Sequence, residues 1–267
     1  MPRAFDTLFS MSNRVKNFND YVILKDNTID FLFKPNSKFR SKIIEENYPI
    51  PRLTKKVFFN NNELLVNPGV FIPRTETECL VKITQEWISR INLSDFSYID
   101  LCSGTGNILI SLLDKYRDNI YRYSAVDASY TSCKNVLENI QLKKYTSKGD
   151  VYCTNWTQFL KENSHWELIT MNPPYIGKNE FTALNKSTNL YKYDPKWALQ
   201  SEETGFSHYS KIIEFAVNNS YWKLIILECS EFHESNWKNL DLTSKNIQIN
   251  RYYDHLNKFR VVVLNRM

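Results

Sequence analysis

The sequence predicts an α/β protein with a largely parallel sheet that is covered by helices on both faces. From about residue 75 onward, short apolar runs typical of buried strands alternate with amphipathic helical stretches. Strands that alternate with helices in this way are joined by crossovers and lie parallel. A glycine-containing turn follows the first of these strands, and an Asn-Pro-Pro-Tyr segment follows the fourth. Both mark strand carboxyl ends, the edge at which open α/β sheets bind ligands.

The composition is that of an ordinary globular protein. The chain has 267 residues, of which 42% are hydrophobic and 24% are charged; this suffices for one α/β domain and a small extra module. No segment approaches the ~20 apolar residues that cross a bilayer, so we expect no membrane span. The five cysteines are dispersed and include no CxxC pair, which favours a reducing compartment. Because the four histidines also lack metal-ligand spacing, we expect no metal site.

The net charge of +5 comes from Lys and Arg residues that are spread along the chain. Such mild basicity fits a solvated surface and equally the approach to an RNA-rich or acidic partner. Because no Lys/Arg-rich stripe is present, we expect no direct sequence-specific contact with nucleic acid. We also expect a monomer.

Two segments precede the main domain. Residues 1–50 predict a small helical module, which the proline cluster at 49–51 interrupts. Residues 51–73 predict a β-hairpin linker, because the apolar runs 57–59 and 64–66 flank an Asn-rich turn. The main α/β domain is expected to cover residues 74–267.

The main domain is expected to contain seven strands and five helices. The predicted strands cover residues 97–101, 121–126, 149–153, 166–171, 222–228, 246–252 and 259–264. The predicted helices cover residues 75–91, 106–116, 130–143, 207–219 and 232–240. A short link joins the last two strands, so they should pair antiparallel. The stretch 175–206 is a long connection without clear periodicity, and such connections usually carry function.

The first predicted strand ends in the sequence Asp100-Leu101-Cys102-Ser103-Gly104-Thr105-Gly106. Gly104 and Gly106 let the backbone turn tightly and approach a ligand without a Cβ in the way. A turn of this kind can also serve chain reversal alone. The second strand ends at Asp127, about twenty residues beyond the glycines, where a carboxylate can accept both hydroxyls of a ribose.

The nucleotide at this site could be a dinucleotide or S-adenosyl-L-methionine. The DxxxGxG pattern lacks a third glycine for a pyrophosphate, which favours the methyl donor. After the third strand, Asn155 and Trp156 are placed to contact adenine by a hydrogen bond and by stacking. The alternative for Trp156 is a core or rim aromatic residue.

The segment Asn172-Pro173-Pro174-Tyr175 follows the buried run 168–171. Two prolines stiffen the loop and remove two backbone donors, so its carbonyls are free to accept from a ligand. The Asn172 amide carbonyl and the Pro173 carbonyl form a pair of acceptors for an NH2 group, and the Tyr175 ring offers a flat face. Such a site suits the planar NH2 group of a carboxamide or an amino-base, although a plain turn would have the same residues.

Taken together, these segments resemble the release factor glutamine methyltransferases of the HemK/PrmC family. Residues 70–78, Val-Phe-Ile-Pro-Arg-Thr-Glu-Thr-Glu, are similar to that family's LIPRxETE signature. The pairing of this signature with Asn-Pro-Pro-Tyr is specific, whereas Asn-Pro-Pro-Tyr alone also occurs in amino-base methyltransferases. Further matches in the family's order are Asp100 to Gly106, Asp127, Tyr193-Asp194-Pro195, Ala198-Leu199, Glu228, Asp254 and 260–263.

The resemblance implies a seven-stranded Rossmann-like class I methyltransferase domain at 74–267, with S-adenosyl-L-methionine as cofactor. It implies methylation of the side-chain amide nitrogen of the glutamine in the Gly-Gly-Gln loop of a class I peptide-chain release factor. The module at 1–50 would contact that release factor. An amide nitrogen is a poor nucleophile, so Asn172 and the Pro173 carbonyl would accept its hydrogens and orient it. Tyr175 would hold the amide plane by packing.

The motifs and the resemblance together predict three sets of site residues. The catalytic residues are Asn172, Pro173 and Tyr175. The cofactor-binding residues are Asp100, Ser103, Gly104, Thr105, Gly106, Asp127, Asn155, Trp156 and Asn172. The substrate-binding residues are Asn172, Pro173, Pro174, Tyr175, Arg74 and Glu76. Arg74 and Glu76 could instead form only a cap and salt-bridge arrangement at a helix start, and Glu228 is a candidate acceptor behind the site.

The sequence departs from the family pattern in three places. Cys102 stands where the family usually has a glycine, and Asn155 where it usually has an aspartate. The usual Gly-Gly-x-Asp-Gly loop is here Ser-Glu-Glu-Thr-Gly at 201–205. The first two changes motivate an alternative in which the chain is a non-catalytic, partner-binding member. A second alternative is an amino-base methyltransferase acting on RNA or DNA, which would need a flipped base.

The first sixteen residues carry Arg3, Arg14 and Lys16 with only Asp6 opposing, and they include several Ser and Thr residues. This is faintly like a mitochondrial targeting segment. Together with the Asn/Lys-rich composition, it leads us to expect a mitochondrial protein, with a cytoplasmic location as the alternative.

Overall fold

The computed structural model describes residues 43, 46, 48–187, 190–202 and 204–266, with side chains left undescribed at 183–191. The helical module expected at residues 1–50 therefore lies almost wholly outside the described residues. The same holds for the basic segment at 1–16.

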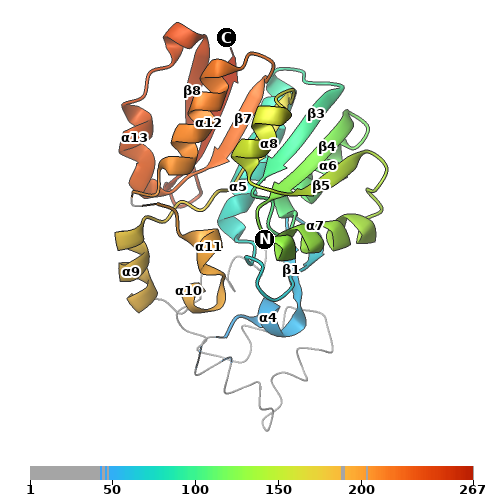
Figure 1. The fold of residues 1–267 in the computed structure, drawn as a ribbon, viewed down its shortest axis with the longest axis vertical. Coiled ribbons are helices and arrows are strands. Elements are labelled where there is room, and N and C mark those ends of the chain that lie inside the picture. Colours follow the sequence, from blue (N-terminus) through green and yellow to red (C-terminus); the bar gives the residue numbers. More distant parts are fainter. Residues whose placement is uncertain (1–42, 44–45, 47, 188–189, 203, 267) are drawn as a thin grey trace.

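A seven-stranded sheet forms the centre of the protein, as the sequence predicted (Figure 1). Its strands are β3 (Phe96–Leu101), β4 (Ile120–Asp127), β5 (Gly149–Cys153), β6 (Leu168–Met171), β7 (Leu224–Glu228), β8 (Ile247–Tyr253) and β9 (Phe259–Arg266). Their order is β5-β4-β3-β6-β7-β9-β8. Strands β3 to β7 are parallel, and β9 is antiparallel to both β7 and β8. The antiparallel pairing expected for the last two strands is confirmed.

Helices cover both faces of this sheet and bury two apolar clusters. One cluster packs α5 (Glu78–Arg90), α6 (Asn107–Tyr116) and α7 (Tyr130–Leu142) against the sheet. The other packs α8 (Trp156–Glu162), α12 (Ser207–Asn218) and α13 (Glu234–Lys238) against the opposite face. The central strands β3, β6 and β7 are fully buried. Their sequences are therefore mostly apolar and do not alternate between apolar and exposed polar residues.

The expected hairpin is present in the linker. It consists of β1 (Lys56–Phe59) and β2 (Asn62–Leu65), paired antiparallel, and it follows the short helix α4 (Ile50–Thr54). The side chains of Asn135 and Asn139 on α7 bind the backbone around Leu65 and Asn67, with N–O distances of 2.6 to 3.0 Å. These side-chain amides bind backbone groups at the end of β2 that a neighbouring strand would otherwise bind, and so hold the hairpin on the main domain.

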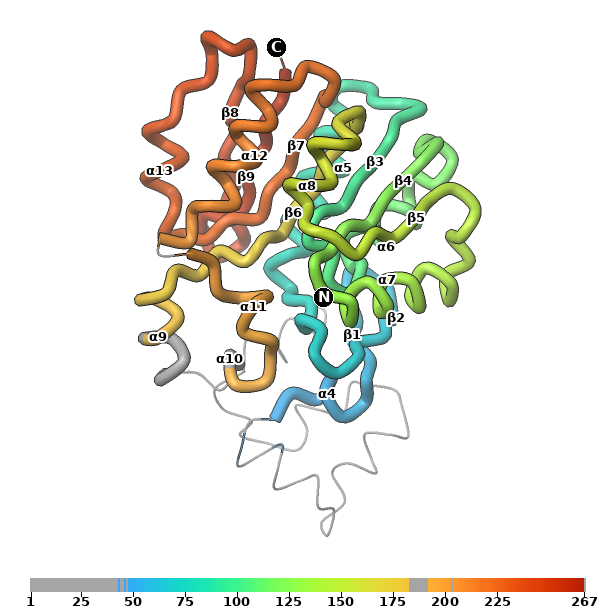
Figure 2. The backbone as a smooth tube through the Cα atoms, viewed as in Figure 1, coloured from blue at the N-terminus to red at the C-terminus, as the bar shows by residue number. Residues whose placement is uncertain are grey.

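The long connection at 175–206 contains helices that the sequence did not predict. They are α9 (Lys178–Ser187), α10 (Leu190–Tyr193) and α11 (Lys196–Leu199), and Figures 1 and 2 show them beside the linker at one end of the sheet. Helices α10 and α11 are too short to show a helical period, and α8 was missed for the same reason. The remaining short elements are the 3-10 turns η2 (Thr75–Thr77), η3 (Glu231–His233) and η4 (Thr243–Lys245).

Candidate active site

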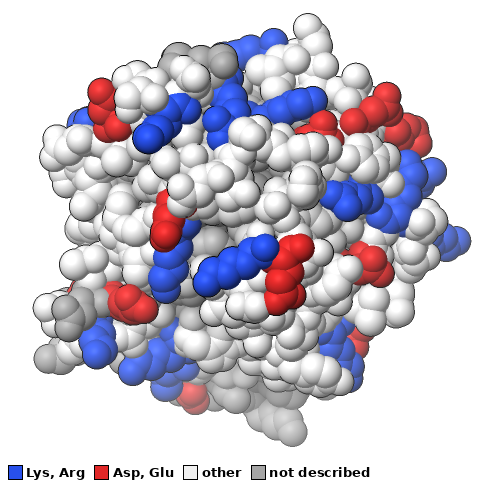
Figure 3. Space-filling view, turned by 45° about the horizontal axis from the view of Figure 1, so that its top comes forward, with Lys and Arg blue, Asp and Glu red and all other residues white. Residues whose placement is uncertain are grey.

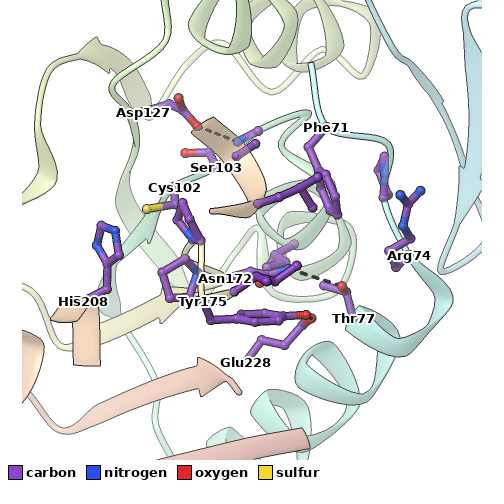
Figure 4. A pocket seen from close by; sticks show the side chains of 18 of the residues that line it. Phe71, Arg74, Thr77, Cys102, Ser103, Asp127, Asn172, Tyr175, His208 and Glu228 are labelled. Carbon is purple, nitrogen blue, oxygen red and sulfur yellow. Dashed lines mark hydrogen bonds between the residues drawn. The ribbon is translucent and has the colours of Figure 1, made fainter. Parts of the chain in front are cut away.

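A cavity of about 960 Å³ opens at the carboxyl edge of the sheet. All of the predicted site residues except Asp100 and Gly106 line it (Figure 4). The lining members are Arg74, Glu76, Ser103, Gly104, Thr105, Asp127, Asn155, Trp156, Asn172, Pro173, Pro174 and Tyr175. The glycine turn, the Asn-Pro-Pro-Tyr loop and the linker, which are far apart in the sequence, therefore share one cavity.

The turn after β3 has a left-handed backbone at Cys102, Gly104 and Gly106, with φ of 58°, 57° and 78°. A Cβ on Gly104 would meet no atom within 4 Å, whereas a Cβ on Gly106 would lie 3.3 Å from Val136. Gly104 thus leaves open space on the cavity side, and Gly106 permits the close approach of α6 and α7. Because Cys102 is not a glycine, its left-handed conformation costs about 1 kcal/mol or more.

Asp127 lies between the glycine turn and the start of α7. Its Oδ2 accepts from the Gly104 backbone N–H at 2.9 Å, and its Oδ1 accepts from Ser129 N–H at 2.8 Å. Burial raises the pKa of the carboxyl group, and these two hydrogen bonds offset part of that rise. The carboxylate orients the turn and faces the cavity with its remaining lone pairs.

Asp100 is fully buried behind the turn and does not line the cavity. Thr170 Oγ1 donates to its Oδ1 at 2.7 Å, while its Oδ2 has no hydrogen-bond partner among the described residues. Burial raises its pKa to about 7. A cationic group near Oδ2 would favour the ionised form.

Asn155 and Trp156 lie at the start of α8, on the cavity wall. Asn155 Oδ1 caps this helix by accepting from Thr157 N–H at 2.8 Å and from Thr157 Oγ1 at 2.7 Å, so its acceptor atom is already engaged. Trp156 is a buried member of the core, and its indole N–H donates to His208 Nδ1 at 3.1 Å. Trp156 therefore packs the core and contributes one edge to the cavity; the adenine contact stays a prediction.

The Asn-Pro-Pro-Tyr loop is held from behind by two side chains. Asn172 Nδ2 donates to Thr77 Oγ1 at 3.3 Å, and the Tyr175 hydroxyl donates to Glu228 Oε1 at 3.2 Å (Figure 4). Thr77 and Glu228 are both buried and line the cavity. Sequence reasoning noted Glu228 as an acceptor behind the site but missed Thr77, although Thr77 lies inside the quoted 70–78 signature.

Arg74 is part of a buried ion cluster centred on Asp194. The carboxylate of Asp194 pairs with Arg74 and with Arg52, the latter at 2.7 Å, and accepts from the Ile72 backbone N–H at 3.2 Å. The Asp194 side chain is 1% exposed. The cluster joins both ends of the linker to the connection that carries α10 and α11, so the structure gives Arg74 an anchoring contact in addition to its place on the wall.

The rim of the cavity combines acidic and apolar side chains. Glu76 is exposed there, and Trp197, Phe232 and Leu256 are exposed to 48%, 63% and 64%. On the face seen in Figure 3, Lys/Arg and Asp/Glu are intermixed rather than gathered in one stripe. That surface offers no single-sign track for a nucleic-acid backbone.

Gly205 allows the chain to pass close to the Tyr175 backbone. It has φ of 77°, and a Cβ there would lie 2.2 Å from the Tyr175 carbonyl oxygen. We expect Gly205→Ala to lower the free energy of unfolding by about 3 kcal/mol, from left-handed strain plus the clash. Gly69→Ala is the matched control, since Gly69 has φ of 81° but open space around its Cβ, and it should lose only about 1 kcal/mol. Equal losses in urea denaturation would contradict the close-contact argument.

Within the described residues, no helix is long and apolar enough to span a membrane. Nor do three or more His, Cys, Asp or Glu side chains of that part of the chain gather in a geometry that could hold a metal ion.

Several proteins with sequences similar to this chain are named release factor glutamine methyltransferase. It is 28% identical over 250 residues to a release factor glutamine methyltransferase of Mycoplasma mycoides, covering 84% of this chain and 85% of that protein. It is also 28% identical over 238 residues to the Schizosaccharomyces pombe protein named "Probable MRF1 mitochondrial N(5)-glutamine methyltransferase", covering 82% of this chain and 76% of that protein. The chain is a relative of the release factor glutamine methyltransferases. It is an enzyme of the methyltransferase class.

Solved structures agree on the fold. The hMettl16 catalytic domain in complex with a MAT2A 3′UTR hairpin matches with a TM-score of 0.59 at 11% identity, over 76% of this chain and 74% of that one. A human methyltransferase 10 domain containing protein matches with a TM-score of 0.52 at 11% identity, over 76% of this chain and 88% of that one. The Rossmann-like methyltransferase fold is thereby confirmed. No family model matches the chain.

Proposed function

We propose that this enzyme uses S-adenosyl-L-methionine to methylate the side-chain amide nitrogen of a glutamine in the Gly-Gly-Gln loop of a peptide-chain release factor. The observation that carries the proposal is the Asn172 amide. Its Nδ2 is turned back toward Thr77, which leaves Oδ1 as an acceptor on a wall of the cavity. The names of the relatives support a glutamine of a release factor as the target.

The cavity fits the proposed methyl donor. Gly104 leaves space where any other residue would place a Cβ, and Asp127 presents a carboxylate suited to ribose hydroxyls. When bound, the donor supplies a methyl group on a sulfonium as the electrophile. Asp127, Ser103, Gly104 and Thr105 would hold it.

Orientation is the main contribution that the chain's own residues make to the reaction. Asn172 Oδ1 and the Pro173 carbonyl accept the two hydrogens of the target amide, which turns its nitrogen lone pair toward the methyl group. The Tyr175 ring holds the amide plane, and the contact of its hydroxyl with Glu228 fixes the ring. No general base is required, because the product nitrogen loses its extra proton after transfer.

The test is labelled methyl transfer from S-adenosyl-L-methionine to purified release factor, with mass spectrometry of the Gly-Gly-Gln peptide. The expected result is one methyl group on the glutamine of wild-type release factor and none on a release factor whose glutamine is replaced. RNA and DNA are assayed in parallel. Methylation of a nucleic acid in place of the release factor would overturn the proposal, as would the absence of donor binding in calorimetry.

We expect Asp127→Asn to weaken binding of S-adenosyl-L-methionine by roughly tenfold or more, because a hydrogen bond to a charged acceptor is lost. Calorimetric titration measures the Kd directly. Asp150→Asn is the matched control: Asp150 is exposed on the neighbouring strand β5 and does not line the cavity, so its Kd should equal that of wild type. An unchanged Kd in Asp127→Asn would remove Asp127 from the donor site.

We further propose a mitochondrial location, with cytoplasm as the alternative. The support is the weakly basic start of the sequence and the mitochondrial relative in Schizosaccharomyces pombe. Expression of the full chain with a carboxyl-terminal fluorescent tag, followed by co-localisation with a mitochondrial marker, tests it. Diffuse cytoplasmic fluorescence would contradict it.

A further inference from the structure

His208 lies on the cavity wall, in the first turn of α12. Its Nδ1 accepts from the indole N–H of Trp156 at 3.1 Å, and the centroids of the two rings are 6.1 Å apart. In Figure 4, His208 lies on the side of Cys102, away from Phe71 and Arg74. It therefore belongs to the part of the wall that the glycine turn and the start of α8 form.

The contact with Trp156 determines which ring nitrogen of His208 carries a hydrogen. An indole N–H can only donate, so Nδ1 must offer it a lone pair. A neutral imidazole then carries its hydrogen on Nε2, on the other side of the ring. None of the described residues accepts a hydrogen bond from this Nε2–H. His208 thus brings an N–H group to the cavity wall that is available to a ligand.

The surroundings of His208 keep its ring neutral. Burial lowers the pKa of His208, and the charge of Lys211 acts in the same direction, whereas the charge of Glu202 opposes them. Lys211 and Glu202 also pair with each other, at 3.9 Å. Protonation of Nδ1 would set two N–H groups against each other at the Trp156 contact. The neutral ring is therefore the form that fits this structure.

His208 is placed where a base would lie if Asp127 holds a ribose. Asp127 ends β4 and pairs in register with Cys153, which ends the neighbouring strand β5. The chain then continues through Asn155 into α8, which begins with Trp156. Because neighbouring strands lie only about 4.8 Å apart, a nucleoside held by its ribose at the end of β4 reaches the end of β5 with its base.

The polar groups at this end of the cavity are donors. Asn155 Oδ1 already accepts from the Thr157 N–H at 2.8 Å and from Thr157 Oγ1 at 2.7 Å. The groups that remain for a ligand are Asn155 Nδ2 and the Nε2–H of His208. Adenine carries ring nitrogens that only accept hydrogen bonds, so its ring edge matches these donors.

We propose that His208 is a cofactor-binding residue whose Nε2–H donates to a ring nitrogen of the adenine of S-adenosyl-L-methionine, while Trp156 holds the imidazole in the tautomer that can donate. The inference rests on the proposed use of this cofactor and adds to it a contact from α12. With the hydrogen on Nδ1 instead, the lone pair of Nε2 would face that of the adenine nitrogen, and the contact would be repulsive.

Calorimetric titration with S-adenosyl-L-homocysteine, the demethylated cofactor, tests the contact without methyl transfer. We expect His208→Phe, which keeps a flat ring but has no N–H, to raise the Kd by roughly fivefold to tenfold. His208→Gln supplies an NH2 group at similar reach and should recover most of the affinity. His165→Phe is the matched control with wild-type Kd, because His165 is exposed, packs against Tyr221 and does not line the cavity.

Analogues of S-adenosyl-L-homocysteine identify the group that His208 contacts. In the 1-deaza, 3-deaza and 7-deaza forms, one ring nitrogen of the adenine is replaced by C–H. For one of these three ligands, wild type and His208→Phe should bind equally, because the hydrogen bond is then absent from both. A loss of affinity in His208→Phe that persists with all three analogues would overturn the adenine contact.

A second measurement uses the free protein and reports on the tautomer. In 15N NMR spectra at neutral pH, we expect the His208 ring of wild type to carry its hydrogen on Nε2. Trp156→Phe keeps an aromatic ring but removes the indole N–H, so both tautomers should appear. A wild-type ring with its hydrogen on Nδ1 would contradict the proposal.

The outcomes separate this inference from the proposed function. A wild-type protein that binds neither S-adenosyl-L-methionine nor S-adenosyl-L-homocysteine overturns the proposed function and, with it, the adenine contact. The tautomer measurement still reports on His208 and Trp156 in that case. A wild-type protein that binds both ligands, with an equal Kd in His208→Phe, overturns the role of His208 alone.

Discussion

Asn172→Ala is expected to lower kcat by about a hundredfold or more while it leaves the affinity for S-adenosyl-L-methionine nearly unchanged. The substitution removes the acceptor that orients the target NH2 group, so the lost interaction belongs to the transition state rather than to donor binding. Asn172 reaches Thr77 through Nδ2 only, which leaves the glycine turn and Asp127 untouched. The measurement is single-turnover methyl transfer to release factor at saturating donor, combined with calorimetric titration of the donor.

The matched control for Asn172→Ala is Asn250→Ala. Asn250 lies on the edge strand β8, where its Nδ2 donates to Asn265 Oδ1 at 2.8 Å, and it does not line the cavity. Its loss should leave kcat at the wild-type value. Activity of Asn172→Ala equal to that of the control would refute the orientation mechanism. A Kd for the donor that rises in parallel with the loss of kcat would instead assign Asn172 to donor binding.

The central sheet, and the residues that meet at its carboxyl edge, could be predicted from the sequence. Strands β3, β6 and β7 are buried along their whole length and rich in apolar residues because both faces of the sheet are covered, and segments of that kind are visible without a structure. Parallel strands also end at a common edge. The turn at 102–106 and the loop at 172–175 therefore had to approach each other whatever their separation in sequence.

Contacts that depend on side-chain direction were not predictable in the same way. Thr77 and Asn172 are 95 positions apart, and nothing local distinguishes a threonine that faces an amide from one that faces solvent. Asp100 illustrates the reverse case: its place in the motif predicted a cavity residue, but its side chain lies buried behind the turn. The short helices of the 175–206 connection are held by tertiary contacts rather than by an amphipathic period.

The ion cluster around Asp194 is a side-chain contact between two segments that the sequence analysis had singled out. It joins the 70–78 signature to the Tyr-Asp-Pro segment at 193–195. Arg52 lies at the start of the linker and Arg74 directly follows its end, and both bind one carboxylate on the connection. Next to that carboxylate, α11 supplies Leu199, whose backbone carbonyl accepts from the Ile176 N–H at 3.0 Å. The cluster thus holds the cavity wall that carries Ile176 and Leu199 against the linker.

Asp194→Asn is expected to lower the free energy of unfolding by about 3 kcal/mol, since it leaves two arginines beside a buried site without their counter-charge. The Arg52 and Arg74 side chains are only 7% and 19% exposed, so water cannot replace the lost carboxylate at low cost. Urea denaturation measures the change. Limited proteolysis should show faster cleavage within 175–206 than in wild type, because the connection loses its anchor to the linker.

The control for this prediction is Glu63→Gln, which breaks an ion pair of a different kind. Glu63 pairs with Lys56 at 2.8 Å across the hairpin, but the two side chains are 44% and 45% exposed. An exposed pair of this sort contributes less than about 1 kcal/mol, because water solvates the separated charges almost as well. Similar losses of stability in Asp194→Asn and Glu63→Gln would show that burial adds nothing to the Asp194 cluster. The apolar contacts among Ile176, Phe181 and Leu199 would then be what stabilises the cavity wall.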